Sequence, residues 1–191
     1  MATRVLINCD DFGMHPTIND AIIEILEGGL ISSVSILPTA PYFQDAANAV
    51  KHFKRVSVGV HLALSAEYKN LPLRPVLPTA NVGSLCMIDG RFYPDFFPIS
   101  PRARAEEIAA ELRAQIESVL ATGIQISHLD AHMFFNSPQH AGPEIFELTR
   151  NLANEYGVPL RGAAMVGGER IPTHMIWDNY DTADERRAFY Q

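Results

Sequence analysis

Short aliphatic runs alternate with amphipathic segments along most of the chain. Runs rich in Val, Ile and Leu predict buried strands at residues 4–9, 31–37, 55–64, 124–129 and 158–164. Apolar residues spaced for one helical face predict helices at residues 16–27, 41–52, 100–122 and 143–156. This alternation predicts parallel β-α units with right-handed crossovers, either in an open doubly wound sheet or in part of a barrel.

The segment between Ser65 and Ser100 breaks this pattern. It contains several prolines and scattered aromatic residues, and it has no helical period. Loops of this length inside a compact domain are usually binding loops or lids. We therefore expect a single domain over residues 1–191 with a long loop insertion at about 65–100.

Composition and charge narrow the class of protein. The 191 residues include 15 Lys and Arg against 22 Asp and Glu, a formal charge of −7. This balance excludes a general nucleic-acid binder, which needs a basic face. The apolar runs are far shorter than the roughly 20 residues that span a bilayer, and no secretory signal is recognisable, so we expect no membrane partner. Two cysteines, Cys9 and Cys86, are too few for a disulfide framework, which favours a cytoplasmic protein.

Acidic and imidazole side chains gather at the carboxyl ends of three predicted strands. Asp10 and Asp11 follow the first, His61 lies in the third, and the fourth runs into His128-Leu129-Asp130-Ala131-His132. Carboxyl ends of parallel strands meet at one edge, so these groups should converge. One carboxylate and two imidazoles suit a divalent cation. Consecutive side chains of an extended backbone point to opposite sides, so Asp11 is expected to bind the metal while Asp10, at a turn, acts as a base.

Other interpretations of these residues remain open. Asp10-Asp11 could cap a helix or form a turn, and His61 could be a core histidine. His128-Leu129-Asp130 also matches half of a two-histidine, one-carboxylate iron site, although the flanking helical patterns do not suit the all-β folds that commonly house it. No Gly-x-Ser-x-Gly elbow and no phosphate-binding loop is present.

In these motifs the sequence resembles the YdjC/ChbG-like carbohydrate deacetylases, relatives of the polysaccharide deacetylases. The resemblance rests on residues 8–13 (Asn-Cys-Asp-Asp-Phe-Gly), 58–62 (Val-Gly-Val-His-Leu) and 128–132, and extends to residues 74–76. It implies a (β/α)-barrel-like α/β fold with parallel strands and a hydrolase that removes acetyl groups from N-acetylated sugars or short oligosaccharides. It implies a divalent metal, Mg²⁺ or Zn²⁺, held by Asp11, His61 and His132.

The resemblance also implies that Asp10 is the general base. The spacing of Asp130 suggests that it orients a neighbouring histidine. Candidate sugar contacts in the long loop are Tyr68, Arg74, Phe92 and Tyr93, and for each of them packing within the loop is an equal alternative.

The sequence departs from the family pattern in two places. Met133-Phe134-Phe135 stands where many members carry further histidines, and no His-Pro-Gly segment follows to supply a general acid. We therefore expect a shortened or truncated C-terminal part, whose exposed sheet edge homo-oligomerisation could cover. Two alternatives follow: a metal- or sugar-binding module without turnover, or another metallohydrolase such as a phosphoesterase.

Overall fold

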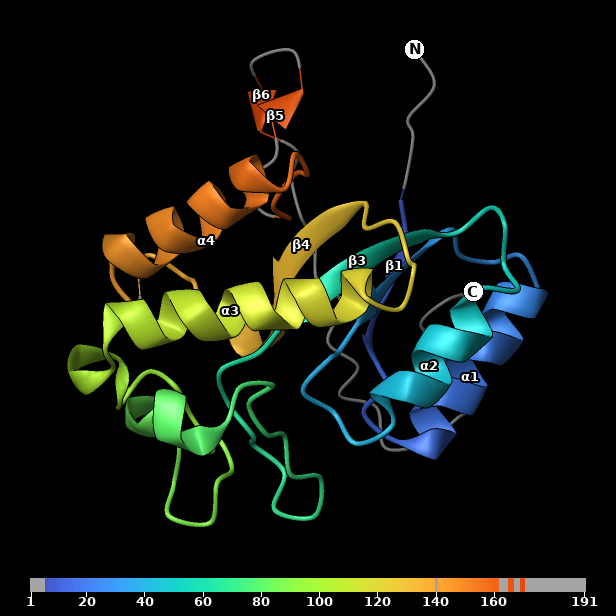
Figure 1. Ribbon diagram of the computed structural model, residues 1–191. Coiled ribbons are helices and arrows are strands. Elements are labelled where there is room, and N and C mark those ends of the chain that lie inside the picture. Colours follow the sequence, from blue (N-terminus) through green and yellow to red (C-terminus); the bar gives the residue numbers. More distant parts are fainter. Residues whose placement is uncertain (1–5, 140, 162–164, 167–168, 171–191) are drawn as a thin grey trace, which may run out of the picture.

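The computed structural model describes residues 6–139, 141–161, 165–166 and 169–170. Strands and α-helices alternate along the chain, and short 3-10 turns occupy part of the long loop (Figure 1). The elements are β1 (Asn8–Phe12), α1 (Pro16–Glu27), β2 (Ser33–Ile36), α2 (Phe43–Val50), β3 (Ser57–Leu62), α3 (Ala105–Leu120), β4 (His128–Ala131), α4 (Pro143–Glu155), and the short strands β5 (Met165–Val166) and β6 (Glu169–Arg170).

Strands β1 to β4 form one parallel sheet in the order in which they occur along the chain. A doubly wound sheet reverses its strand order at a switch point, whereas a barrel adds each strand beside the one before it. Beyond β4, Leu160 forms a parallel bridge with Leu129 and extends the same order. The predicted α/β fold with parallel strands is thus confirmed, and the strand order is that of a barrel.

One face of the sheet is apolar and packs under the helices. The side chains that alternate onto it from β2, β3 and β4 are almost fully buried: Val34, Ile36, Val58, Val60 and Leu129. Helix α3 covers this face with a stripe of Ile108, Leu112, Ile116 and Val119, each without exposed area. Helices α1 and α2 lie side by side at the β1 and β2 end of the sheet (Figure 1).

Buried polar side chains of α3 anchor the long loop that precedes it. Glu111 has no exposed area, and its two carboxylate oxygens accept hydrogen bonds from the backbone N–H groups of Val76 and Leu77. Glu107 accepts the backbone N–H of Ser84 at 2.8 Å. These bonds satisfy backbone groups that a loop outside the sheet and helices would otherwise leave unpaired.

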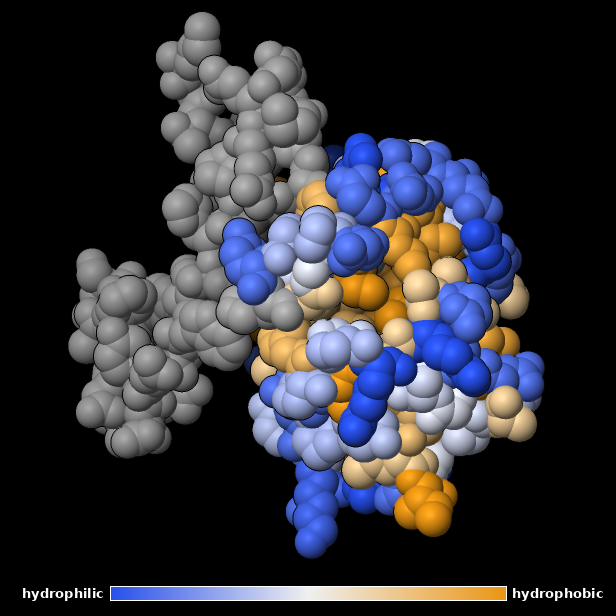
Figure 2. Space-filling model, turned by 90° about the vertical axis from the view of Figure 1, so that its left-hand side faces the viewer, coloured by the Kyte–Doolittle hydropathy of each residue, from blue (hydrophilic) through white to orange (hydrophobic). Residues whose placement is uncertain are grey.

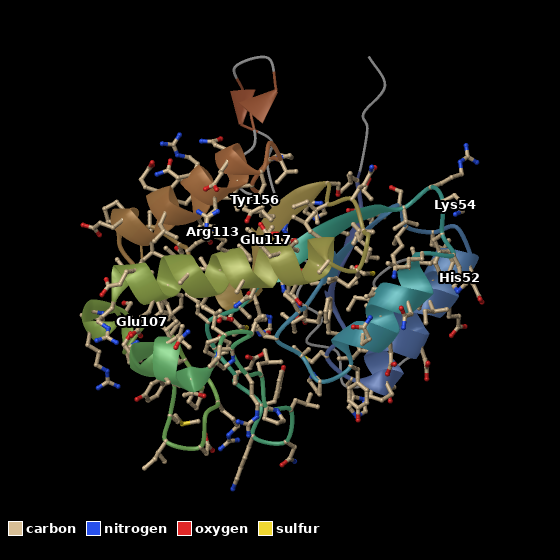
Figure 3. All side chains as sticks on the ribbon, in the orientation of Figure 1. His52, Lys54, Glu107, Arg113, Glu117 and Tyr156 are labelled. Carbon is tan, nitrogen blue, oxygen red and sulfur yellow. The ribbon has the colours of Figure 1, made fainter. Side chains whose placement is uncertain are left out.

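Charged and aromatic side chains tie α3 to α4. The Arg113 guanidinium lies over the ring of Tyr156 and donates to Glu155, and the Tyr156 hydroxyl donates to Glu117 (Figure 3). At the end of the molecule where both helices begin, apolar side chains are flanked by hydrophilic ones (Figure 2). No helix in the described ranges is both long enough and apolar enough to cross a bilayer.

Several predicted element boundaries were wrong. The first strand begins at Asn8, because its pairing with β2 starts at Ser33, and Leu6 and Ile7 are left exposed. The fourth strand begins at His128, opposite Gly59, so residues 124–127 are not strand.

The helix predicted from residue 100 begins at Ala105, because the extended backbone of Ala103 separates it from a 3-10 turn at Ser100–Arg102. Helix α2 begins two residues later than predicted, at Phe43. Of the fifth predicted strand, residues 158–161 are described and contribute only the Leu160 bridge, and residues 162–164 lie outside the described residues.

Candidate metal centre

The second face of the sheet is polar and carries the candidate site. Residues paired in register project to the same side, so Ser35 and Gly59 share this face with His128, and His61 shares it with Asp130. Position 59 has no space for a side chain beside the imidazole of His128, because a Cβ there would lie 2.2 Å from Nε2 of His128. The strand registers thus bring polar groups from distant parts of the sequence to one surface.

A bulge in β1 places the two adjacent acids of this strand. From the Cys9–Val34 pair to the Phe12–Ile36 pair, β1 moves on by three residues while β2 moves on by two, so β1 contains one extra residue. Asp11, within this bulge, has a left-handed backbone with φ of 63°. The expectation that Asp10 and Asp11 point to opposite sides was therefore wrong. Each contributes a carboxylate oxygen to a group that includes His61. The extra residue turns both carboxylates toward the polar face.

Three candidate ligand atoms face one another at this edge. Oδ1 of Asp11 lies 3.3 Å from Nε2 of His61 and 3.0 Å from Nδ1 of His132. The two imidazole nitrogens are 3.3 Å apart. Both histidines are buried, with 2% and 3% of their surface exposed. The structure thus brings together the three residues predicted as metal ligands.

The outer nitrogen of each imidazole is held by a carboxylate. Nδ1 of His61 lies 2.7 Å from Oδ1 of Asp130, and Nε2 of His132 lies 2.9 and 3.0 Å from the two carboxylate oxygens of Glu67. A carboxylate accepts a hydrogen bond and cannot donate one, so these outer nitrogens carry the protons. A carboxylate behind a metal-binding histidine fixes its tautomer in this way.

The donor set fits a divalent cation. Oδ1 of Asp11 is buried and, within the described part of the chain, accepts no hydrogen bond of acceptable geometry although two nitrogens face it. Among the described residues, Asp10, Asp11, Glu67 and Asp130 bring four carboxylates against one guanidinium, that of Arg161. With neutral imidazoles this leaves three negative charges, of which a divalent cation would offset two.

Without a cation, protons bound to the imidazoles offset part of the negative charge of the carboxylates. Burial disfavours protonation of His61, but the charges and hydrogen bonds of Asp130 and Asp11 outweigh it and raise the pKa of His61 to about 10. Asp11 and Glu67 likewise raise the pKa of His132 against the effect of burial. Burial would raise the pKa of Asp11, yet the facing imidazoles hold it well below its usual range. Metal binding must therefore displace protons.

Asp10 is held by a bidentate ion pair that the sequence analysis missed. The two terminal nitrogens of Arg161 donate to the two oxygens of Asp10, each at 2.7 Å, and Asn8 donates to Oδ1 at 2.7 Å. Arg161 also lies 3.0 Å from Oδ2 of Asp130, which accepts a hydrogen bond from the Ser35 hydroxyl. Arg161 therefore fixes the Asp10 carboxylate beside the three facing ligand atoms.

Asp10, His61 and Asp130 form a second group with ligand atoms close enough for a cation. Nδ1 of His61 is already hydrogen-bonded to Asp130, and the Arg161 guanidinium contacts both Asp10 and Asp130. A cation there would meet the guanidinium charge, so the geometry favours the group of Asp11, His61 and His132.

Two residues of the site were missed by the sequence analysis, and one candidate contact was wrong. Glu67 lies in the long loop without any motif around it, whereas Arg161 lies inside the strand predicted at residues 158–164, where a cationic side chain in an apolar run was an available signal. Phe92 was expected to contact sugar but has no exposed area and belongs to the core.

The other three loop candidates have varied surroundings. Tyr68 is exposed, Arg74 donates to the backbone oxygen of Asp89, and the ring of Tyr93 lies under Arg102.

Comparisons with known proteins identify the family of this chain. The model of the YdjC-like protein family matches residues 4–188. The chain belongs to the YdjC-like family. Among its relatives, a carbohydrate deacetylase of Enterococcus faecalis is 29% identical over 98% of this chain and 73% of its own length. A carbohydrate deacetylase of Clostridium beijerinckii is 31% identical over 87% of this chain and 63% of its own length.

A solved structure supports the fold as well. A crystal structure from Enterococcus faecalis, described as a candidate cellobiose-phosphate cleavage protein, has a TM-score of 0.72 and 30% identity over 85% of this chain. It is matched over 59% of its own length. The chain thus spans between 59% and 73% of the lengths of these three YdjC-like relatives.

Proposed function

We propose that this YdjC-like chain is a metal-dependent hydrolase that removes acetyl groups from N-acetylated sugars or short oligosaccharides. The observation that carries the proposal is the convergence of Asp11, His61 and His132 beside a separately oriented Asp10. Such a site combines a place for a Lewis acid with a place for a base, as hydrolysis of an amide requires. The deacetylase names of the relatives supply the reaction type and the carbohydrate class.

Asp11, His61 and His132 would hold the cation through Oδ1, Nε2 and Nδ1. When bound, a divalent cation polarises an acyl oxygen and makes water a stronger nucleophile near neutral pH. Two imidazoles with one carboxylate favour Zn²⁺ or a similar transition metal on affinity, while Mg²⁺ prefers oxygen ligands. In the metal-bound state Asp130 and Glu67 would accept hydrogen bonds from the outer nitrogens, so that Nε2 of His61 and Nδ1 of His132 face the cation without a proton.

Asp10 acts as the general base in this proposal. Its carboxylate is about one-third exposed, which leaves it accessible to a nucleophilic water, and it is paired with the Arg161 guanidinium. The bidentate pair restricts rotation of the carboxylate, so that one oxygen lone pair keeps a fixed direction toward the reacting water. Asp10 would accept the proton of that water as the acyl carbon is attacked.

The charge of the site disfavours a phosphoesterase. With a divalent cation bound, four carboxylates against one guanidinium leave one net negative charge, which repels the phosphate group of such a substrate, whereas an acetamide is neutral. A phosphate elsewhere on a sugar is compatible with the site, provided that it lies away from the acids.

Acetate release tests the proposal. The purified chain, freed of metal with chelator, is incubated with N-acetylglucosamine oligomers after addition of Zn²⁺ or Mg²⁺. We expect acetate only with added metal and a loss of about 10²- to 10⁴-fold on Asp10→Asn, which removes the base and keeps the shape. Sugar or metal binding without acetate release would support the binding-module alternative, and cleavage of phosphate esters alone would support the phosphoesterase.

A further inference from the structure

Glu67 is the one carboxylate of the site that comes from the long loop. Its side chain is 18% exposed, and both of its oxygens lie within 3.0 Å of Nε2 of His132. The residue before Glu67, Ala66, is held in place by a hydrogen bond from its backbone N–H to the backbone oxygen of Tyr93. The carboxylate is therefore held against the imidazole by an anchored backbone.

The two histidines of the site turn different ring nitrogens toward Asp11. His61 turns Nε2 toward Asp11 and gives Nδ1 to Asp130, whereas His132 turns Nδ1 toward Asp11 and gives Nε2 to Glu67. The rings stand nearly perpendicular, with an interplanar angle of 80°. An imidazole without a fixed partner can flip or exchange its tautomer, which would turn an N–H group toward the other ligands.

His132 has less support from its own backbone than His61. His61 lies inside β3, with a paired strand on each side, whereas His132 lies just after β4. The next two residues, Met133 and Phe134, both have φ of 51°, a left-handed conformation that non-glycine residues seldom adopt. A side-chain partner is therefore needed more at His132 than at His61.

From these contacts we propose that Glu67 is a positioning residue, which fixes His132 with its Nδ1 lone pair toward the metal position and so couples the long loop to metal binding. This inference rests on the proposed function for the presence of a metal. Glu67 itself does not touch the metal position, because the imidazole ring lies between them. Carboxylates that orient a metal-binding histidine typically contribute 10- to 100-fold in metal affinity.

Zinc affinity measured by competition with a chromophoric chelator is the first test. We expect Glu67→Gln to weaken Zn²⁺ binding by about 10-fold, because its amide oxygen still accepts the Nε2 proton, and Glu67→Ala by about 100-fold. Glu24→Gln, an equal charge change at an exposed position of α1, should leave the affinity unchanged. Parent-like affinity in both Glu67 variants would overturn the proposal.

A proton NMR measurement on metal-free protein separates this proposal from the proposed function. The Nε2 proton of His132 should give a downfield, slowly exchanging resonance in the parent and in Glu24→Gln, and it should disappear in Glu67→Ala. Its presence in Glu67→Ala would overturn the proposal. A parent that binds no Zn²⁺ would refute the proposed metal site, and the NMR measurement would still decide whether Glu67 holds His132.

Discussion

Substitution of Gly59 by alanine tests the packing of the polar face directly. A Cβ at this position would lie 2.2 Å from Nε2 and 2.4 Å from Cε1 of His128, well inside van der Waals contact. The φ angle of Gly59 is not left-handed, so the backbone itself accepts alanine. The imidazole of His128 must therefore move, and its contact with the Ser35 hydroxyl at 3.2 Å is lost.

The expected cost of Gly59→Ala follows from these contacts. Overpacking of a filled site costs about 1–3 kcal/mol, and a lost hydrogen bond costs about 1 kcal/mol. We expect the free energy of unfolding to fall by about 2 kcal/mol, which lowers the melting temperature of a chain of this size by about 4–8 °C.

The double variant Gly59→Ala/His128→Ala provides the matched control, measured by urea unfolding. Removal of the imidazole vacates the space that the new methyl group needs. The double variant should therefore be more stable than the sum of the two single effects predicts, by about 1 kcal/mol or more. A Gly59→Ala protein as stable as the parent, or strictly additive effects, would refute this account of the strand register.

Three further predictions concern the base, the bulge and the loop anchor. Arg161→Lys should lower the rate of acetate release by about 100-fold through misorientation of Asp10, while Zn²⁺ affinity stays close to that of the parent; an equal loss of both would show that Arg161 supports the metal site instead. Asp11→Asn should abolish Zn²⁺ binding and lower the stability of the metal-free protein, because the two facing imidazoles lose the carboxylate that stabilises their protonated forms, although Asn still tolerates the left-handed backbone. Asp11→Ala should lose about 1–2 kcal/mol more, and equal unfolding free energies of the two variants would contradict the strained bulge. Burial outweighs the hydrogen bonds to Glu111 and raises its pKa, so the stability of the parent relative to Glu111→Gln should fall as pH rises above the unfolded value of about 4.3. Urea unfolding of both proteins from pH 4 to 7 measures this difference, and a relative stability that increases with pH would contradict the sign.

The sequence was sufficient for the alternation of strands and helices and for the convergence of the site. Runs such as residues 55–64 have the composition of buried strands, and parallel strands bring their carboxyl ends together whatever the length of the connections. His61 and His132 are therefore predicted from the sequence alone to lie at one edge of the sheet with Asp11. That level of prediction depends on topology alone.

The details that give the site its geometry depend on tertiary pairing. The bulge at Asp10-Asp11 arises from the register with β2, which no local pattern in residues 8–12 encodes. Glu67 comes from a loop without periodicity, and the backbone next to it is held by the non-local hydrogen bond from Ala66 to Tyr93. Arg161 was within reach of prediction, because it is a cationic residue inside the strand predicted at residues 158–164.

The most direct test of the proposed metal site is anomalous X-ray diffraction from crystals grown with Zn²⁺. We predict one strong peak about 2.0–2.2 Å from a carboxylate oxygen of Asp11, Nε2 of His61 and Nδ1 of His132, with Asp10 still paired to Arg161. A peak coordinated instead by Asp10 and Asp130, or the absence of any peak at this edge of the sheet, would contradict a metal site at Asp11, His61 and His132.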